Sequence, residues 1–335
     1  MALDAIARAA TRAPDGKTVA LVFASYDFLE LILNWACHAL AIGVHWFALV
    51  AMDLRLHRAL SALPHVASHA VLLPRVRRNA TRITKLNVIG ERQRFGLQVL
   101  ERGVSVVHSD ADALWIKDPW PLLAAGDDVV AERIWGKPLS VVKAWGAGIC
   151  TGFYYLRATP AVVALARTVR DEVSAKRKRQ PSWQASDQYF INTVLHRHGV
   201  TWAGGRRMEP QTSMATRYLE LNTTRGVAAT AKGQLRIAML AHGVVPRACP
   251  VLSAAELSTL RGGRRLRGKA RWWQSLLRSA HVLHCFPPGG DPAPGEKRFV
   301  FMGHPKHTQA ELAFAQRQGL WRLDGTRRAC RARRR

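Results

Sequence analysis

Short apolar segments alternate with amphipathic segments along the first third of the chain, and this alternation restricts the fold more than any other feature. Strands are expected at 18–25, 44–53 and 69–74, and the stretches 27–43 and 81–103 have the periodicity of helices. Parallel strands need crossover connections, which are usually helical. The pattern therefore predicts an α/β fold with a mainly parallel sheet flanked by helices.

The first predicted helix carries signals at both ends. Asp27 and Glu30 have the spacing of a capping box, in which each side chain bonds a backbone N–H of the first turn. Gly43 follows the last apolar position, as expected for a residue that ends a helix.

The second half of the chain is less regular. Strands are expected at 148–158 and 234–241, a helix opens at Thr159 and Pro160, and another covers 185–199. The alternation of strand and helix therefore continues.

The length of the chain fits one large α/β domain or two ordinary ones. The chain has 335 residues, of which 48% are hydrophobic, enough to bury a substantial core. We expect an N-terminal segment at 1–17, one domain at 18–324 and a disordered basic tail at 325–335. No window approaches the roughly 20 apolar residues of a membrane span, so no span is expected.

The cysteines do not form a recognisable framework. Five are present, an odd number, widely separated and without a CxxC pair. Neither a set of disulfides nor a zinc site is predicted, and the cysteines are interpreted as mostly buried thiols. They are Cys37, Cys150, Cys249, Cys285 and Cys330.

The chain is strongly basic. Fifty Lys and Arg residues against 23 Asp and Glu residues give a formal charge of +27, which attracts any polyanion. The excess is also what a biased genome composition produces. The densest basic stretches are not interleaved with aromatic residues that could stack on bases, so no specific nucleic-acid partner is expected.

Two aspartates follow an apolar run. Val106 and Val107 lead into Asp110 and Asp112, which can point the same way from an extended chain. Two carboxylates suit Mg²⁺ or Mn²⁺. The alternative is an Asx turn after a strand.

Polar residues also follow other predicted strands. Ser25 and Tyr26 come after the first strand and Asp53 after the second. In open α/β sheets, ligands bind beyond the carboxyl ends of the strands. The sequence therefore predicts a site at this edge of the sheet.

Several blocks of sequence carry a resemblance to a known family. They are VVHSDADALWIKDPWP (106–121), GFYYLRAT (152–159), SDQYFIN (186–192), LNWACHALAIGVHWFALVAMD (33–53) and the closing segment 281–324. Together, and in the order in which they follow along the chain, these blocks resemble the nucleotide-diphospho-sugar transferase family that includes plant cell-wall xylosyl- and arabinosyltransferases. The resemblance covers roughly residues 18 to 324 and implies a retaining glycosyltransferase of the GT-A fold.

The resemblance implies a metal site and a donor site. Asp110 and Asp112 would hold Mn²⁺ or Mg²⁺, with His284 as a third ligand and His281 as its competitor. The remaining donor contacts implied are Ser25, Tyr26 and Asp53 near the nucleoside, Arg82, Lys85 and Lys297 at the diphosphate, Asp110 also at the ribose or diphosphate, and Gly152 beside the sugar.

The resemblance also implies catalytic positions. Asp187 and Gln188 would face the reactive carbon, whereas the alternative is a helix N-cap at Ser186 or Asp187. Relatives usually have Asn where this chain has Cys150, which weakens one expected contact with the donor sugar.

The implied reaction moves a sugar from a nucleotide diphosphate, by analogy a uridine diphosphate sugar, to a hydroxyl of a glycan or glycoprotein with retention of configuration. Relatives generally work in the Golgi lumen behind an N-terminal membrane anchor. We expect the same location if such an anchor is missing from the sequence, and a soluble enzyme otherwise.

Two other classes of function compete. A basic, non-enzymatic nucleic-acid or polyanion-binding protein depends on charge alone, because no nucleic-acid-binding motif is present. A phosphatase of the haloacid dehalogenase type also places two aspartates one residue apart after a strand. Its nucleophile directly follows apolar residues, whereas His108 and Ser109 intervene here.

Overall fold

The computed structural model describes most of the chain. The described residues are 2–74, 85–134, 138–179, 186–203, 222–246, 271, 274, 277–284, 313, 315, 316, 318, 320–323, 329 and 330, with the side chains of 85–87 and 177–179 left aside. In this part of the chain, every helix is too short or too polar to cross a bilayer.

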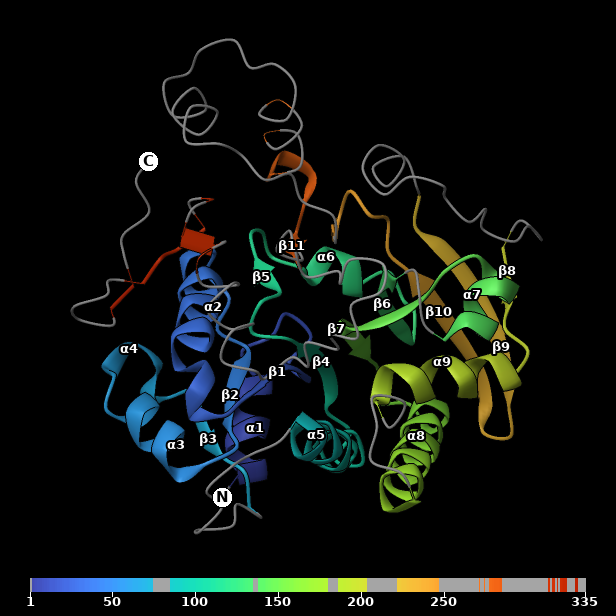
Figure 1. Cartoon of the computed structure of the whole chain (residues 1–335), viewed down its shortest axis with the longest axis horizontal. Coiled ribbons are helices and arrows are strands. Elements are labelled where there is room, and N and C mark those ends of the chain that lie inside the picture. The colour runs from blue at the N-terminus through green and yellow to red at the C-terminus, as the bar shows by residue number, and fades with distance from the viewer. Residues whose placement is uncertain are drawn as a thin grey trace, which may run out of the picture.

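Helices and strands alternate along most of the first half of the chain and less regularly after it (Figure 1). The helices are α1 Ala2–Ala10, α2 Leu29–Ala41, α3 Leu54–Ser61, α4 Pro64–Ala67, α5 Lys85–Leu100, α6 Trp120–Leu123, α7 Leu139–Trp145, α8 Pro160–Arg179 and α9 Asp187–Arg197, with a 3₁₀ turn at Tyr26–Phe28. The strands are β1 Thr18–Ala24, β2 Phe47–Ala51, β3 Ala70–Leu72, β4 Ser105–Ser109, β5 Leu114–Trp115, β6 Val129–Ile134, β7 Gly148–Leu156, β8 Thr201–Trp202, β9 Thr224–Thr230, β10 Gly233–Met239 and β11 Val282–Leu283.

One nine-stranded sheet organises the molecule. Its order is β3-β2-β1-β4-β7-β6-β10-β9-β8. β1, β2, β3 and β4 pair in parallel, as do β6 and β10, whereas β7 and β9 run against their neighbours. The predicted α/β class with a mainly parallel sheet is confirmed.

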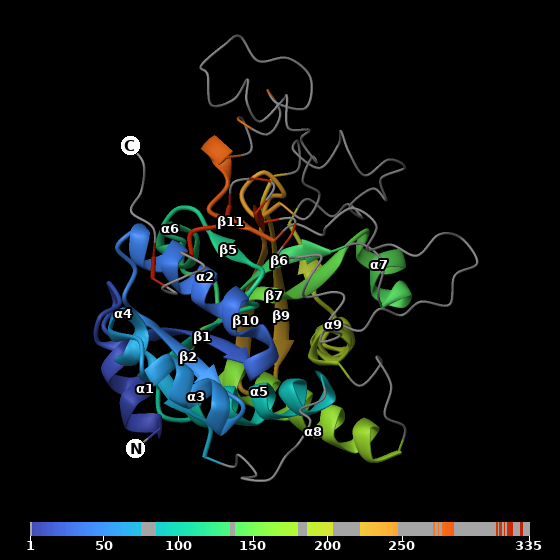
Figure 2. The ribbon, with the colours of Figure 1, turned by 60° about the vertical axis from the view of Figure 1, so that its left-hand side comes forward.

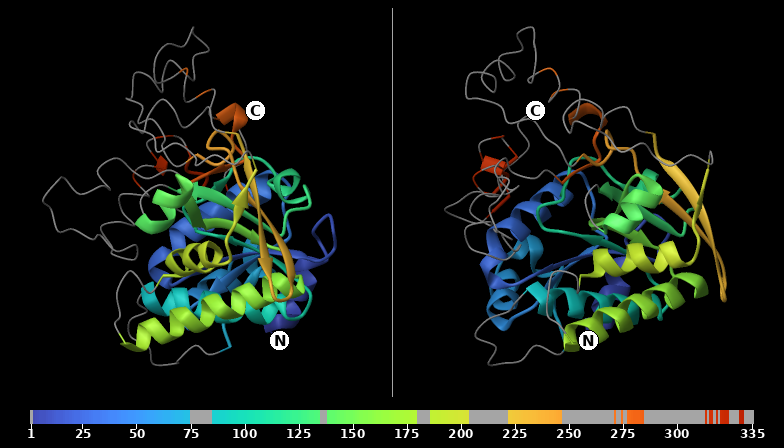
Figure 3. Two further views of the ribbon diagram at one scale, coloured as in Figure 1. Left: turned by 90° about the vertical axis from the view of Figure 1, so that its right-hand side faces the viewer. Right: turned by 45° about the vertical axis from the view of Figure 1, so that its right-hand side comes forward.

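Helices cover both faces of the sheet. α1, α5, α8 and α9 pack on one face, and α5 lies beside α8 (Figure 2). α8 and α9 cross this face together (Figure 3). α2 and α3 pack on the other face. The sheet is therefore the middle layer of three.

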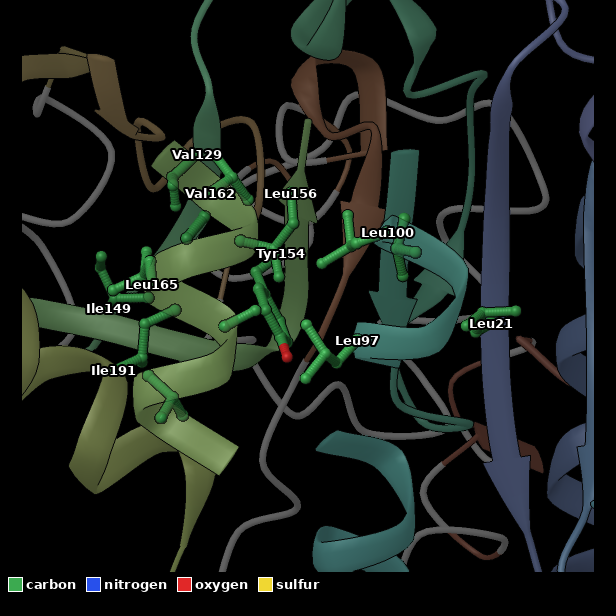
Figure 4. Packing of buried hydrophobic residues seen from close by; sticks show 14 of the residues in the cluster. Leu21, Leu97, Leu100, Val129, Ile149, Tyr154, Leu156, Val162, Leu165 and Ile191 are labelled. Carbon is green, nitrogen blue, oxygen red and sulfur yellow. The ribbon is translucent and has the colours of Figure 1, made fainter. Parts of the chain in front are cut away.

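The central strands are apolar on both faces because both faces are covered. In β4, Val107 packs in the cluster under α2, and Val106 packs in the cluster under α5. Side chains from α5, α8 and β7 interdigitate in the second cluster (Figure 4). Alternation along a strand thus decides which core each residue joins.

The start of α2 differs from the prediction. Residues 26–28 form a 3₁₀ turn, and neither Ser25 nor Phe28 bonds the following backbone through its side chain. The predicted capping box of Asp27 and Glu30 is therefore wrong. Gly43 does adopt a positive φ of 77° after the helix, as its position predicted.

The interpretation of the cysteines is corrected in one respect. Cys37 on α2 and Cys330 form a disulfide, with the Cα atoms 5.2 Å apart. Cys150 is a buried thiol, as expected. The prediction for Cys249 and Cys285 lies outside the described residues.

Candidate active site

The two aspartates of the DAD sequence lie on a loop that is held in several places. The backbone N–H of Asp110 donates to the carbonyl of Gly152 on β7 at 2.7 Å. The indole of Trp35 on α2 donates to the carbonyl of Ala113 at 2.9 Å and contacts Ser109 Oγ at 3.1 Å. The loop is thus fixed from the sheet on one side and from α2 on the other.

His284 reaches the same point from the end of β11. Its Nε2 lies 3.5 Å from Asp112 Oδ1, and its Nδ1 lies 2.7 Å from Oε2 of Glu132 on β6. The ring packs against Gly152, where a Cβ atom would stand 2.0 Å from the ring Cε1. Glycine is therefore required there by the histidine. The competing His281 instead bonds the carbonyl of Asp118 at 2.7 Å through its Nδ1.

The geometry of Asp110, Asp112 and His284 fits one metal ion. Each offers a ligand atom, and these atoms all lie within 4.8 Å of one another. Two carboxylates and an imidazole form a donor set that Mn²⁺ accepts. His284 also belongs to a second, fully buried group with Glu132 and Cys150.

A buried arginine joins the two halves of the site. Arg92 on α5 donates from Nη1 to Asp110 Oδ1 at 2.8 Å and from Nε to Asp187 Oδ2 at 2.7 Å. Burial alone would lower the pKa of Arg92, but the charges of Asp187 and Asp110 outweigh it and raise the pKa. Arg92 is therefore a permanent cation at the centre of the site.

Opposing effects act on the pKa of the Asp110 carboxyl group. Burial raises the pKa of its carboxyl group, Arg92 acts in the opposite direction, and the neighbouring charge of Asp112 raises the pKa further. The net direction is upward, so a further positive charge beside the two carboxylates would be favourable. The Asp110 carboxylate does more than the Asx-turn alternative requires, because it accepts from the Arg92 guanidinium.

At the start of α9, one residue caps the helix and the next belongs to the site. Ser186 is the cap, because its Oγ accepts from the backbone N–H of Tyr189 at 3.2 Å. Asp187 is 2% exposed and accepts from Thr151 Oγ1 at 3.2 Å and from Gln93 Nε2 at 3.0 Å. Asp187 thus anchors a polar network beneath the aspartate loop.

The polar residues that follow β1 and β2 form a second group at the carboxyl ends of the parallel strands. Asp53 caps α3, since its carboxylate accepts from the N–H of Leu56 at 2.6 Å, and it also accepts from the N–H of Tyr26 at 2.8 Å. The Arg55 guanidinium lies 3.6 Å from the centroid of the Tyr26 ring. Ser25 is buried beside them. Asp53 therefore has a structural role whether or not it contacts a nucleoside.

The predicted donor and catalytic roles remain predictions, and three of the residues cannot be placed. Arg82 and Lys297 lie outside the described residues, and Lys85 begins α5 but its side chain is not among those described. Gln188 follows Asp187 at the start of α9 and donates its backbone N–H to the Asp187 carboxylate at 2.8 Å.

Arg92 and Glu132 were missed by the sequence analysis. Arg92 falls between the buried residues Ile89 and Phe95 of α5, at helical spacing. Glu132 lies within the buried strand β6. A charge inside an apolar stripe was the available signal in both cases, because such a charge needs a buried partner.

Comparison with known proteins assigns the chain to a family. The model of the nucleotide-diphospho-sugar transferase family matches residues 44–241, which is more than half of the chain. The chain therefore belongs to the nucleotide-diphospho-sugar transferase family.

Two proteins of Arabidopsis thaliana are similar in sequence. Beta-arabinofuranosyltransferase RAY1 is 24% identical over 225 residues, which cover 62% of this chain and 39% of that protein. UDP-D-xylose:L-fucose alpha-1,3-D-xylosyltransferase 3 is 25% identical over 210 residues, which cover 57% of this chain and 54% of that protein. The chain spans about half the length of these relatives, or less.

Solved structures also match. The galactosyltransferase LgtC in complex with donor and acceptor sugar analogues matches with a TM-score of 0.44 and 11% identity, over 88% of this chain and 96% of that chain. Mouse xyloside xylosyltransferase 1 matches with a TM-score of 0.39 and 9% identity, over 83% and 99% of the two chains.

Proposed function

We propose that this chain is a glycosyltransferase that moves a sugar from a nucleoside diphosphate, preferably uridine diphosphate, to a hydroxyl of a glycan or glycoprotein. One observation carries the proposal: Asp110, Asp112 and His284 converge within 4.8 Å at the carboxyl edge of the sheet, in a chain of the nucleotide-diphospho-sugar transferase family. The curated relatives are an arabinofuranosyltransferase and a xylosyltransferase.

Asp110, Asp112 and His284 would hold Mn²⁺ or Mg²⁺, and the bound ion would neutralise the charge that develops on the leaving diphosphate. Arg92 keeps the Asp110 carboxylate oriented through their 2.8 Å contact. Ser25, Tyr26 and Asp53 would lie at the nucleoside. Arg82, Lys85 and Lys297 would contact the diphosphate, and Gly152 would lie beside the sugar.

The transfer proceeds with retention. The bond between the anomeric carbon and the diphosphate oxygen breaks, a bond to the acceptor oxygen forms on the same face, and the leaving phosphate oxygen takes the acceptor proton. Gln188 would face the reactive carbon. Asp187 is deeply buried and paired with Arg92, which supports a role in holding this wall of the site. The product's anomeric configuration, read by NMR, tests retention.

Donor binding is tested by thermal shift with nucleotide sugars and Mn²⁺. A ligand that binds the folded state alone stabilises it by about 2.7 kcal/mol at a hundredfold excess over its dissociation constant. We expect a uridine diphosphate sugar to raise the melting temperature only with Mn²⁺ present. The shift should disappear in the Asp110→Asn/Asp112→Asn variant, because the ion that links protein and diphosphate is lost.

A matched control is available on the same domain. Asp127 and Asp128 are a second pair of carboxylates close in sequence, but they are buried and pair with Arg225, Arg236 and Arg157. The Asp127→Asn/Asp128→Asn variant should melt earlier yet keep its ligand-induced shift. Undiminished binding by a folded Asp110→Asn/Asp112→Asn variant would reject the proposed function and favour binding of anions by basic charge alone.

A further inference from the structure

A buried carboxylate lies directly behind the candidate metal ligand His284. Glu132 on β6 is 0% exposed, and its Oε2 lies 2.7 Å from the imidazole Nδ1. An ionised carboxylate is costly to bury unless it accepts hydrogen bonds. The pairing of Glu132 with His284 is therefore specific, and each residue limits how the other can be arranged.

The pairing decides which nitrogen of His284 faces the aspartates. A carboxylate has acceptors but no donor, so Nδ1 carries the proton in the hydrogen bond to Glu132. In the neutral ring, Nε2 then has a lone pair, and Nε2 is the atom 3.5 Å from Asp112 Oδ1. This is the tautomer that a metal ligand requires.

β6 and β7 fix the positions of Glu132 and His284. The pairing of β6 with β7 shifts register between Ala131 and Glu132, so that Glu132 lies opposite Cys150. On β7, Gly152 leaves room for the ring of His284, which would otherwise meet a Cβ atom at 2.0 Å. The irregular register and the glycine together place carboxylate and imidazole side by side.

We propose that Glu132 is a positioning residue that holds His284 in the Nδ1–H tautomer and thereby strengthens metal binding at Asp110, Asp112 and His284. This inference rests on the metal site of the proposed function. A carboxylate bonded to the outer nitrogen of a ligating histidine fixes the ring and raises its basicity, and loss of such a partner typically weakens metal affinity about 10- to 100-fold.

A double-mutant cycle on Mn²⁺ affinity, measured by titration calorimetry, tests the proposal. Glu132→Gln keeps the shape of the side chain and removes its charge, and should raise the Mn²⁺ dissociation constant about 10- to 100-fold. His284→Ala should weaken binding at least as much. The double variant should bind no more weakly than His284→Ala, because Glu132 acts through the ring. Asp127→Asn, the loss of a buried carboxylate elsewhere, should leave the affinity unchanged.

Losses that multiply in the double variant, or wild-type affinity in Glu132→Gln, would overturn the proposal. Histidine ¹⁵N spectra of the metal-free protein give a second readout, with the His284 signal identified by its absence in His284→Ala. We expect the Nδ1–H tautomer in the wild type and its loss in Glu132→Leu, whose side chain has no acceptor for that proton, or in Glu132→Ala if the leucine variant does not fold.

The two readouts separate this inference from the proposed function. A wild type with the Nε2–H tautomer overturns the role of Glu132 even if Mn²⁺ binds tightly. A wild type with the Nδ1–H tautomer that binds no Mn²⁺ overturns the metal site and, with it, the positioning role.

Discussion

Arg92 shows how one residue can make a cluster of carboxylates compatible with a folded protein. Asp110 and Asp187 come from different elements and both bond the same guanidinium. Without that cation, two charges would face each other in a region of low water access, where desolvation is costly. The planar fork of arginine donates to both carboxylates at once, which a lysine cannot do with the same geometry.

Replacement of Arg92 by methionine should lower the free energy of unfolding by about 3–5 kcal/mol, because a buried carboxylate loses its partner. Urea denaturation measures the loss. Arg102→Met is the matched control, since Arg102 and Asp4 pair with side chains 53% and 57% exposed, and such an exposed pair contributes little to stability. Equal losses in the two variants would show that Arg92 is not the shared counterion. Asp187→Asn should restore part of the stability in the Arg92→Met background.

At the scale of elements, close packing of α5 on β4 brings Arg92 to the strand end. Gly96 lies where α5 passes the ring of His108, and a Cβ atom there would stand 2.9 Å from the ring Nε2. His108 is buried and stacks on Tyr154 with ring centroids 4.7 Å apart. The absence of a side chain at residue 96 therefore sets how closely the helix approaches the sheet.

Gly96→Ala should destabilise the protein despite a gain in helix propensity of about 1 kcal/mol. Overpacking against a ring that cannot move costs about 1–3 kcal/mol. The midpoint of urea unfolding should fall while the far-ultraviolet circular dichroism stays unchanged. Combining Gly96→Ala with His108→Ala should cost less than the sum of the single changes, because the smaller side chain removes the clash. Additive losses would argue against this contact.

The sequence predicted the elements better than the contacts between them. Periodicity located β1, β2 and α8, because burial of one or both faces of an element imposes a local pattern. Asp110 and Asp112 were recognised because alternation after a strand makes their common direction a local property. The partnership of Arg92 and Asp187, 95 residues apart, is set by the docking of α5 beside α9, and no local pattern records it.

At the scale of the whole molecule, residues near the C-terminus are bonded to α2, which lies near the N-terminus. The side chains of Asn34 and His38 on α2 bond the carbonyl of Leu320, and Cys37 between them forms the disulfide with Cys330. On the inner side of the same helix, Trp35 bonds the loop that carries Asp110 and Asp112. α2 therefore connects the returning C-terminal segment (Figure 1) to the aspartate loop.

The disulfide escaped the sequence analysis because its cysteines are separated by 293 residues and no spacing rule applies over such a distance. Disulfides persist in oxidising compartments and are rare in reducing ones. The location of the protein remains a prediction. The odd number of cysteines is also explained in part by the buried thiol of Cys150.

Cys37→Ser and Cys330→Ser should each lower the free energy of unfolding by about 2–4 kcal/mol, because the bond closes a very long loop and restricts the unfolded chain. The measurement is urea unfolding of the oxidised protein. Dithiothreitol should lower the stability of the wild type to that of the variants and leave the Cys37→Ser/Cys330→Ser variant unchanged, which separates loss of the bond from loss of side-chain packing. A wild type whose unfolding midpoint does not respond to the reductant, and whose Cys37 and Cys330 are alkylated without it, would contradict the disulfide.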